Sequence, residues 1–514
     1  MGFVKDIMRR SVGFNPMGWD QARRQMRARI EEHLAHIPEE RPEEGDGLET
    51  IVVVAPWLDT PVPWFTIAIG LMLAERGARV RFVIDDMPYG ANALRHATVL
   101  SAIRYAMKPL EGRFDVTTLS DAPKAAVTKA DEAEIGRLAQ LNATWAMRGE
   151  MPQKGRAQLV ERAIAQNSAA QAYIAGFFAE ARAPQFLFTP GGVFGHSGLW
   201  MRAARSVGAR VGSYDAAGQK GMLIEANGMA CQAEDTPFAF RDLKDESVER
   251  PESVAHALRR GSEELAKRRT GKDNFQYQVA SSTGGDAQLE GGFLIALNSS
   301  WDAAALGPHR AYPTNSQWIV ETVRHLLDHT ERPVIVRQHP AERNPAAATN
   351  DDYAALLGEA FGTHERLHFI AAQDPVNSYA LLEKVCAVIV HTSTIGVEAA
   401  AFGRPVITGS ASWYSQLGFV HFADNRAGYE ALLQAAAAGE LPLTDDMKRD
   451  AELCYYITQC CKLVLTPFNP ANLAEWMAQP LAHWSSDTQV DRAMQALLTG
   501  TPFATLTHRA SLDA

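Results

Sequence analysis

Short apolar runs, each followed by a helical segment, recur along this chain and most constrain the fold that it can adopt. The first two runs, residues 50–55 and 78–84, are separated by a Pro-rich loop and an apolar helix that Gly77 ends. A short β-branched run bounded by turn residues is typical of a strand in a parallel sheet that helices cover on both faces. This spacing predicts a β-loop-α-β unit, which begins a doubly wound sheet.

The pattern continues in two series, which a polar stretch with chain breakers at residues 259–292 separates. In the first series, an Ala-rich helical region at residues 120–180 and a helix at residues 198–207 accompany two further strands, at residues 186–188 and 209–214. In the second series, we expect strands at residues 293–297, 333–337, 367–370, 385–390 and 405–408, with helices between them. Because a chain of 514 residues is too long for one hydrophobic core, the two series predict two domains.

We therefore expect an α/β fold of two Rossmann-like domains that face a cleft, with an N-terminal helical extension. The predicted parts are a helical extension and linker at 1–47, an N-terminal domain at 48–260, a linker at 261–291, a C-terminal domain at 292–465 and a C-terminal helical segment at 466–514 that packs back on the N-terminal domain. Open α/β sheets bind ligands beyond the carboxyl ends of their strands, so the cleft is the predicted binding site.

The composition disfavours several classes of protein. The formal net charge of -10 disfavours a general nucleic-acid binder, because such proteins present a basic surface. The five cysteines have no CxxC spacing, which argues against a disulfide framework. No apolar run reaches the roughly 18 residues of a membrane-spanning helix, and residues 1–10 lack the apolar core of a secretory signal. We therefore expect a cytoplasmic protein.

A basic segment near the N-terminus, residues 19–33, carries Arg23, Arg24, Arg27 and Arg29. Two interpretations are open. The segment can form a helix that lies on an anionic membrane, which would bring the protein to the inner face of the cytoplasmic membrane. Alternatively, it forms a solvated helix packed on the domain surface, which the acidic residues in the segment favour.

Small hydroxylated residues follow the strand predicted at residues 385–390. Thr392, Ser393 and Thr394 allow the chain to turn tightly into a helix, whose amino terminus offers free N–H groups and positive potential to a phosphate. Glu398 falls in the first turns of that helix, where its carboxylate can accept hydrogen bonds from the two hydroxyls of a ribose. The block predicts a nucleotide-binding turn, although an ordinary strand-turn-helix with capping hydroxyls would explain the Ser and Thr residues alone.

A second motif ends the strand predicted at residues 333–337. Arg337 and His339 lie at its carboxyl end, and Pro340 prevents a regular continuation of the strand. An arginine can bind a phosphate through two hydrogen bonds, and a histidine can bind a phosphate or a base. Both side chains are therefore candidates for binding a nucleotide, although a histidine at a strand end can also be a core residue.

Together these motifs resemble known glycosyltransferases. The Ser/Thr turn before the helix with Glu398 resembles the donor-site signature of the GT-B class. The Arg-x-His-Pro motif followed by the Thr-Ser turn resembles the capsule polysaccharide biosynthesis family, which includes Kdo transferases that use a CMP-sugar. The resemblance implies a GT-B enzyme that transfers a sugar from a CMP-Kdo-like or another nucleotide-sugar donor to a growing bacterial surface polysaccharide or glycolipid. It also implies that the N-terminal domain is the acceptor side of the enzyme and the C-terminal domain the nucleotide-sugar donor side. The donor-binding residues that it implies are Arg337, His339, Thr392, Ser393, Thr394 and Glu398.

Ser300 and Asp302 extend this match. They follow the first strand of the second domain, where similar proteins carry a polar loop that approaches the donor phosphates. The resemblance thus adds both residues to the predicted donor site. Alternatively, Asp302 is only a helix cap.

The first domain offers candidates for the chemistry of transfer. Residues 189–196 form a Gly-rich loop that lacks the Lys-Ser or Lys-Thr of a P-loop, which excludes a nucleoside triphosphatase of that type. His196 ends this loop and is a candidate acid–base residue. Asp215 ends the next strand, where it can deprotonate an acceptor hydroxyl, attack the anomeric carbon or merely cap the loop. Further carboxylate candidates are Asp59, Asp85 and Asp86.

We expect neither a metal ion nor another cofactor. No cluster of His, Cys and Asp residues has the spacing of a zinc site, and Asp85-Asp86 is not the Asp-x-Asp that holds a metal in the other large glycosyltransferase class. Arg337, His339 and the helix amino terminus would instead neutralise the leaving phosphate.

Two other functions stay open at this point. A non-hydrolysing sugar-nucleotide 2-epimerase shares the two-domain fold, but it is expected to carry Thr-Asp-Ser-Gly where this chain has Thr-Ser-Thr-Ile at residues 392–395. A non-catalytic subunit that binds a nucleotide-sugar or a polysaccharide would use the same fold without turnover.

Overall fold

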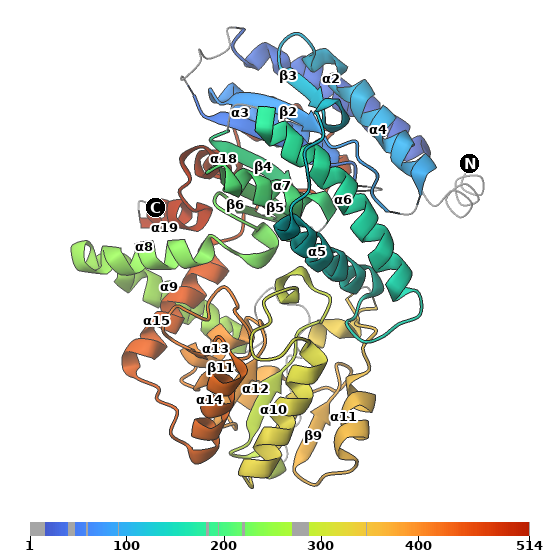
Figure 1. The fold of residues 1–514 in the computed structure, drawn as a ribbon. Coiled ribbons are helices and arrows are strands. Elements are labelled where there is room, and N and C mark those ends of the chain that lie inside the picture. The colour runs from blue at the N-terminus through green and yellow to red at the C-terminus, as the bar shows by residue number, and fades with distance from the viewer. Residues whose placement is uncertain are drawn as a thin grey trace. The chain divides into compact units, whose positions relative to one another are not determined.

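The computed structural model describes residues 16–39, 47–57, 60–90, 92–180, 184–193, 195–217, 221–269, 287–345 and 347–512 (Figure 1). These residues divide into two compact units. The amino-terminal unit comprises the described residues within 1–142, 157–235 and 463–507, and the carboxy-terminal unit comprises those within 143–156, 236–462 and 508–514. Each unit is built on a six-stranded sheet.

The sheet of the amino-terminal unit has the strand order β3-β2-β1-β4-β5-β6. Its strands are β1 (Glu49–Val54), β2 (Arg79–Ile84), β3 (Asp115–Thr118), β4 (Phe186–Pro190), β5 (Arg210–Ala216) and β6 (Met222–Glu225). Neighbouring strands are parallel except β5 and β6, which are antiparallel. In β1, Val52 pairs with Phe82 on one side and Phe188 on the other, so the β-branched run forms a central, buried strand.

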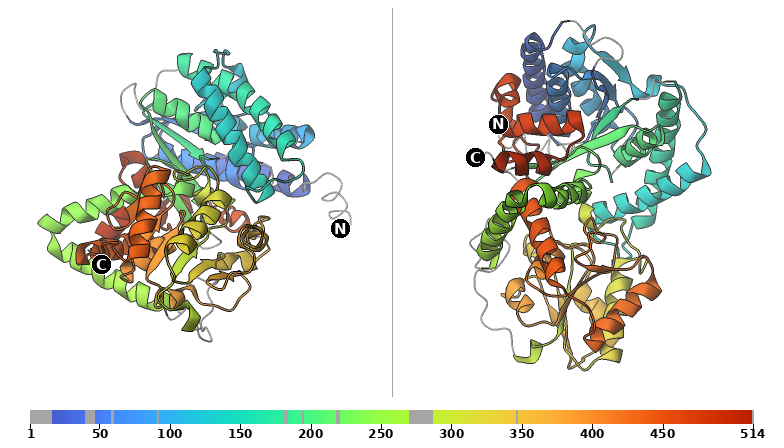
Figure 2. Two further views of the ribbon diagram at one scale, coloured as in Figure 1. Left: turned by 60° about the horizontal axis from the view of Figure 1, so that its bottom comes forward. Right: turned by 90° about the vertical axis from the view of Figure 1, so that its left-hand side faces the viewer.

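Helices cover both faces of this sheet (Figure 2). One face packs against α5 (Lys129–Met147), α6 (Arg156–Glu180) and α7 (Gly195–Ser206), and the other against α2 (Pro16–His33), α3 (Val62–Glu75) and α4 (Ala93–Met107). The helices α16 (Leu473–Trp476), α17 (Leu481–Ser485) and α18 (Thr488–Thr499) join the same core as α3. The rings of Phe65 and Phe468, for example, have centroids 4.7 Å apart. Because neighbours surround it, α3 is apolar on every side.

The sheet of the carboxy-terminal unit has the strand order β12-β11-β10-β7-β8-β9, with all neighbouring strands parallel. Its strands are β7 (Phe293–Ala296), β8 (Val334–Arg337), β9 (Leu367–Ile370), β10 (Ala387–Val390), β11 (Val406–Thr408) and β12 (His421–Phe422). Counted along the chain within each unit, both sheets follow the order 3-2-1-4-5-6. This is the Rossmann order, in which the direction of winding reverses between the first and fourth strands.

Longer and shorter helices complete the described chain. The carboxy-terminal unit contains α8 (Thr236–Glu249), α9 (Pro251–Arg269), α10 (Asn315–His329), α11 (Tyr353–Phe361), α12 (Ser378–Leu382), α13 (Ile395–Ala401), α14 (Arg426–Ala438), α15 (Asp445–Tyr456) and part of α19 (Phe503–Leu512). Short helical turns are η1 (Leu34–His36), η2 (Lys108–Leu110), η3 (Leu119–Asp121), η4 (Ala230–Gln232), η5 (Ala287–Leu289), η6 (Ala303–Ala305), η7 (Pro340–Arg343) and the π-turn η8 (Ile457–Cys461).

The predicted fold class is confirmed: the chain is α/β and GT-B-like, with two Rossmann-like sheets and an N-terminal helix. Every predicted strand is present. The three strands that the sequence did not predict, β3, β6 and β12, are edge strands. Edge strands are short and need no continuous apolar run, as the half-buried residues of β3 and β12 show.

The predicted linker at 261–291 is wrong at its start, because α9 runs without interruption to Arg269. Gly261 is not a break in this helix but the point where α9 approaches α15. A Cβ at Gly261 would lie 3.1 Å from the carbonyl oxygen of Glu452. Residues 236–260 accordingly belong to the carboxy-terminal unit and not to the N-terminal domain. The predicted linker residues 270–286 lie outside the described residues.

The basic helix α2 packs on the amino-terminal unit. Met26 and Ile30 are fully buried in the core that α2 shares with α3 and α4. The apolar face of α2 therefore packs as the second interpretation of this segment expects, against the surface of the domain. Among the residues that the structure describes, no helix is both long enough and apolar enough to cross a membrane.

Gly70 in α3 provides a test of this packing. A Cβ at Gly70 would lie 2.5 Å from the Phe82 ring and 3.3 Å from Val52, so Gly70→Ala should lower the free energy of unfolding by about 1–3 kcal/mol through overpacking. Gly136 in α5 is the matched control, because a Cβ there meets nothing within 4 Å. Gly136→Ala should raise the free energy of unfolding by about 0.5–1 kcal/mol. Urea unfolding measures both, and equal effects would contradict the close approach of α3 to the sheet.

Candidate functional site

A pocket lies where the winding of the carboxy-terminal sheet reverses, beyond the carboxyl ends of β7, β8 and β10. It is called the carboxy-terminal pocket below. Its lining residues are Arg268, Ala296, Leu297, Arg337, His339, Pro340, Ser378, Tyr379, Ser393, Thr394, Ile395 and Glu398. Five of the predicted donor-binding residues are thus brought together: Arg337, His339, Ser393, Thr394 and Glu398.

Arg337 ends β8 and is 2% exposed. Its two Nη atoms donate to the carbonyl oxygens of Ala371 and Val376, the latter at 3.1 Å. Burial, with a further contribution from nearby Arg343, lowers the pKa of Arg337 to about 10, so the guanidinium still carries its charge at neutral pH. Arg337 therefore fastens the loop after β9 to the strand end and places a positive charge at the pocket.

His339 presents a defined hydrogen atom to the pocket. The backbone N–H of Ala341 donates to its Nδ1 at 3.2 Å. Burial lowers the pKa of His339 to about 4, and the charge of Arg337 acts in the same direction. The ring is therefore neutral at pH 7 with its hydrogen on Nε2, because Nδ1 is already an acceptor. Such a ring donates one hydrogen bond to a ligand.

Glu398 lies in α13 and is 5% exposed. The hydroxyl of Tyr379 donates to its Oε2 at 2.7 Å, and Nη2 of Arg268 lies 3.7 Å from its Oε1. Burial and then the Glu398 charge raise the pKa of Tyr379, so this phenol stays protonated and donates. Burial opposes the charge on Arg268, but the Glu398 carboxylate raises the pKa of Arg268 above its ordinary value. Glu398 is thus held as a charged acceptor.

The Thr-Ser-Thr turn is fixed by bonds to its backbone. Asn298 accepts from the N–H of Thr392 at 3.1 Å, and the hydroxyl of Tyr414 donates to the carbonyl oxygen of Ser393 at 2.6 Å. Thr394 occupies the N-cap position of α13 without a side-chain capping bond. Ser393 and Thr394 line the pocket, whereas Thr392 does not.

Ser300 and Asp302 do not line this pocket. The hydroxyl of Ser300 donates to Asp351 at 2.5 Å and lies 3.1 Å from the hydroxyl of Thr349. Asp302 caps η6 by accepting from the N–H of Ala304 at 3.4 Å, which is the alternative role considered for it. In this structure, both residues stabilise loops beside the sheet through these hydrogen bonds.

Sequence reasoning missed two residues of the pocket, Arg268 and Tyr379. Arg268 lies in the part of α9 that was predicted to be a linker, and Tyr379 lies at the start of the short helix α12. Neither belongs to a motif, and both reach Glu398 through contacts between segments distant in sequence. Only the fold brings them together.

A second arrangement that the sequence did not predict involves His391, directly after β10. Its Nε2 lies 3.0 Å from Nδ1 of His309, whose Nε2 lies 3.0 Å from a carboxylate oxygen of Glu150. Glu150 also accepts from the N–H of Asn315 at 2.7 Å. Burial lowers the pKa of His391 well below its ordinary value, so its ring is neutral. This chain of polar contacts fixes the start of the turn at Thr392.

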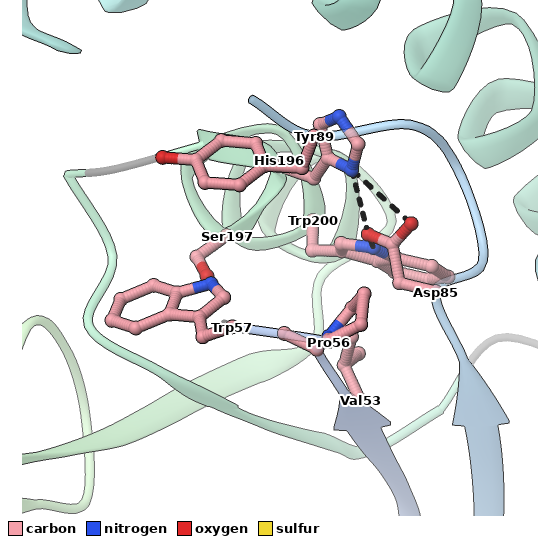
Figure 3. A pocket seen from close by; sticks show the side chains of 9 residues that line it. Val53, Pro56, Trp57, Asp85, Tyr89, His196, Ser197 and Trp200 are labelled. Atoms are coloured by element: carbon pink, nitrogen blue, oxygen red, sulfur yellow. Dashed lines mark hydrogen bonds and ion pairs between the residues drawn. The ribbon is translucent and has the colours of Figure 1, made fainter. Parts of the chain in front are cut away.

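The amino-terminal unit has a pocket at the corresponding strand ends, after β1, β2 and β4. It is called the amino-terminal pocket below. Its lining residues are Val53, Ala55, Pro56, Trp57, Asp85, Tyr89, His196, Ser197 and Trp200 (Figure 3). It therefore contains the predicted acid–base residue His196.

His196 is paired with Asp85. Its Nδ1 lies 3.0 and 3.1 Å from the two carboxylate oxygens of Asp85, which also accepts from Nε1 of Trp200 at 3.0 Å (Figure 3). The N–H of Met87 donates to the same carboxylate at 3.2 Å. Burial opposes ionisation of Asp85, but its contact with His196 and the hydrogen bonds from Trp200 and Met87 keep its pKa below the ordinary value. Asp85 is thus an ionised acceptor for three donors, His196, Trp200 and the N–H of Met87.

The other carboxylate candidates lie elsewhere. Asp215 is half-buried in β5, accepts from the N–H of Ala216 at 2.8 Å and does not line the amino-terminal pocket. Asp86 accepts from the N–H and hydroxyl of Ser120 at 3.0 and 2.7 Å. Asp59 lies outside the described residues. The structure therefore does not bring the two predicted catalytic residues, Asp215 and His196, into one pocket.

A search of the described residues finds no group of three or more His, Cys, Asp and Glu side chains that could hold a metal ion. The five cysteines Cys231, Cys386, Cys454, Cys460 and Cys461 all lie in the described part of the chain, and none of them forms a disulfide.

Comparisons with known proteins found a family model and several solved structures. Residues 266–432 match the family described as "Capsule polysaccharide biosynthesis protein". No curated protein matches the chain. Among solved structures, the Thermosulfurimonas dismutans KpsC "beta Kdo 2,4 transferase" is similar at 15% identity and a TM-score of 0.33, over 49% of this chain and 79% of that chain. The "beta Kdo 2,7 transferase" of the same KpsC is similar at 12% identity and a TM-score of 0.33, over 58% and 85%.

A putative UDP-N-acetylglucosamine 2-epimerase from Listeria monocytogenes is similar at 14% identity and a TM-score of 0.25, over 86% of this chain and 98% of that chain. At these scores, likeness to a solved structure does not distinguish a transferase from an epimerase.

The burial of His339 predicts a pH-dependent stability. Its pKa is about 4 in the folded chain and about 6.5 in an unfolded one. Between these values the unfolded chain binds a proton that the folded chain does not, so stability is lost as pH falls below 6.5. A glutamine at position 339 cannot take up this proton. When the pH falls from 7.5 to 4, the free energy of unfolding of His339→Gln should therefore rise by about 1–3 kcal/mol relative to that of the parent protein. Urea unfolding at several pH values measures the difference, and parallel pH curves would show that the ring is not buried.

Proposed function

The predicted resemblance to the capsule polysaccharide biosynthesis family is confirmed over residues 266–432, and on this basis we propose that the chain is a glycosyltransferase that binds a nucleotide-sugar in the carboxy-terminal pocket. The observation that carries the proposal is the convergence of Arg268, His339 and Glu398 from three separate elements on one pocket. A cation and a neutral N–H donor match the phosphates of a nucleotide, and a carboxylate matches its ribose.

The ribose is assigned to Glu398. An ionised carboxylate has about four acceptor sites. Tyr379 and Arg268 contact one carboxylate oxygen each, and the carboxylate lines the pocket, where it can accept from the hydroxyls of a ribose. Because Tyr379 and Arg268 also fix the orientation of the carboxylate, it would receive the ribose without rearrangement.

The phosphates are assigned to the positive side of the pocket. Arg268 and Arg337 line it, and the Nε2 hydrogen of His339 adds a neutral donor. Cations and donors fixed in place stabilise the charge that develops on a leaving phosphate. We therefore propose transfer without a metal ion. Thr394 and Ser393 complete this side of the pocket from the turn after β10.

The donor that we propose first is a CMP-Kdo-like sugar, because the Arg-x-His-Pro motif accompanies such donors in the family that the chain resembles. Sugars on UDP, GDP or dTDP would also satisfy Glu398. The proposed acceptor is a growing bacterial surface polysaccharide or a glycolipid. Synthesis of such polymers would place the reaction at the inner face of the cytoplasmic membrane.

A thermal-shift screen of the purified protein against CMP, CDP, UDP, GDP and dTDP tests the proposal. A ligand that binds only the folded state raises the melting temperature, by an amount that grows with its concentration above Kd. Stabilisation by one of these nucleotides would identify the donor class. If none of them stabilises the protein, the proposal is wrong, whereas binding without turnover of any sugar donor would favour a non-catalytic subunit.

His339→Ala makes the screen specific for the pocket. Loss of a hydrogen bond to a charged phosphate costs about 1.5–3 kcal/mol, so the affinity for the stabilising nucleotide should fall roughly 10–100-fold. His364→Ala is the matched control. Nδ1 of His364 accepts from the N–H of Arg366 at 3.2 Å, just as His339 does from Ala341, but His364 does not line the pocket. Isothermal titration should therefore find parental affinity in His364→Ala, and equal losses in both variants would remove His339 from the site.

A further inference from the structure

The amino-terminal pocket contains a buried nitrogen atom that forms no hydrogen bond with the described residues. Nε2 of His196 has no hydrogen-bond partner among the described residues, and the His196 side chain is 6% exposed. Leaving a buried polar atom without a partner costs roughly 1–3 kcal/mol. His196 is among the side chains that line the pocket (Figure 3), and a buried atom without a partner is a candidate for binding a ligand hydroxyl.

Asp85 determines which nitrogen of His196 is the acceptor. The carboxylate lies within 3.1 Å of Nδ1, and an ionised carboxylate can only accept hydrogen bonds. The hydrogen of the neutral ring is therefore on Nδ1, and Nε2 carries a lone pair. Trp200 donates to Asp85 at 3.0 Å and holds the carboxylate in place. Carboxylate, imidazole and free Nε2 thus form the arrangement of a general base with its positioning residues.

Aromatic side chains form much of the wall of this pocket. Besides Trp200, two of them line it next to the histidine, Trp57 and Tyr89 (Figure 3). Both approach the Gly-rich loop so closely that side chains are excluded there. A Cβ at Gly191 would lie 2.9 Å from the Trp57 ring, and a Cβ at Gly195 would lie 2.5 Å from the Tyr89 ring. Both glycines also have positive φ values, +69° and +52°, which other residues rarely adopt. The two glycines therefore allow Trp57 and Tyr89 to pack closely against the loop.

We propose that the amino-terminal pocket is the subsite of the acceptor hydroxyl, with His196 as its base and Asp85 as the residue that positions the base. This inference rests on the proposed glycosyl transfer. The acceptor oxygen forms a bond to the anomeric carbon and gives its proton to Nε2 of His196. The bond from the anomeric carbon to the nucleotide phosphate breaks, and its electron pair leaves on the phosphate oxygen. The imidazolium stays paired with Asp85 until it releases the proton to water.

Asp85→Asn tests the positioning role. The amide of Asn can donate to Nδ1 through its N–H, which moves the ring hydrogen to Nε2 and removes the base while His196 remains in place. The turnover number for nucleotide release from the donor, with water or an octyl glycoside as acceptor, should fall roughly 10²–10⁴-fold. The KM for the donor should change little, because the donor is bound elsewhere. Asp86→Asn is the matched control, since Asp86 bonds Ser120 and not His196, and it should keep parental turnover.

The tautomer can be measured directly. In protein labelled with ¹⁵N histidine, the shifts of the two ring nitrogens report which one carries the hydrogen. His196→Gln identifies the His196 signals by their loss. The parent protein and Asp86→Asn should show hydrogen on Nδ1 of His196, and Asp85→Asn should show it on Nε2. Hydrogen on Nε2 in the parent protein would overturn the inference, whatever the activity.

Two further variants distinguish loss of the base from loss of the folded structure. If Asp85→Asn does not fold, Trp200→Phe removes one donor from the carboxylate and should lower turnover by up to about tenfold. His196→Ala should lose turnover and regain part of it with added imidazole, which supplies a base but cannot repair a fold. Full turnover in a folded Asp85→Asn or His196→Ala protein would overturn the base assignment.

The outcomes separate this inference from the proposed function. If the parent protein releases no nucleotide from a sugar donor that carries CMP, UDP, GDP or dTDP, glycosyl transfer is wrong, and the base assignment falls with it. If the parent protein turns over its donor and the Asp85 and His196 variants do so equally well, the transferase stands and the acceptor subsite is wrong. Nucleotide stabilisation of the Asp85→Asn protein equal to that of the parent confirms that the donor site is intact.

Discussion

The reversal of winding between the first and fourth strands is the constraint on which both candidate sites depend. In each sheet the chain leaves the first strand toward one edge and returns at the fourth toward the other, so no connection covers the carboxyl ends between them. The amino-terminal pocket collects residues that follow β1, β2 and β4, and the carboxy-terminal pocket collects residues that follow β7, β8 and β10. These are the first, second and fourth strands of their sheets, so one topological rule produces both pockets.

Different side chains at equivalent positions give the two pockets different chemistry. After the second strand, one unit has Asp85 and the other has Arg337 and His339. After the fourth strand, one has a Gly-rich loop that ends in His196 and the other has the Thr-Ser-Thr turn. A single carboxylate with a bare imidazole nitrogen suits removal of a proton, whereas arginines around one carboxylate suit an anion with a ribose.

The sequence predicts what depends on local pattern. Apolar runs locate the central strands, and Arg337, His339 and Glu398 are found because each lies in a motif next to a strand. What depends on contacts between distant segments is not predicted. Arg268 contacts Glu398 from a helix whose polar residues led to the prediction of a linker. Asp85 contacts His196, which lies 111 positions further along the chain. No period or spacing encodes such a pair, because it exists only once the sheet is assembled.

The two histidines of the pockets illustrate how the fold assigns opposite roles to one side chain. At His339, a backbone N–H donates to Nδ1, so the ring hydrogen is on Nε2 and the exposed edge is a donor. At His196, a carboxylate accepts from Nδ1, so Nε2 is an acceptor. A donor is what a departing phosphate needs, and an acceptor is what an attacking hydroxyl needs. The partner of Nδ1, and not the histidine itself, therefore determines which half of the proposed transfer each unit can serve.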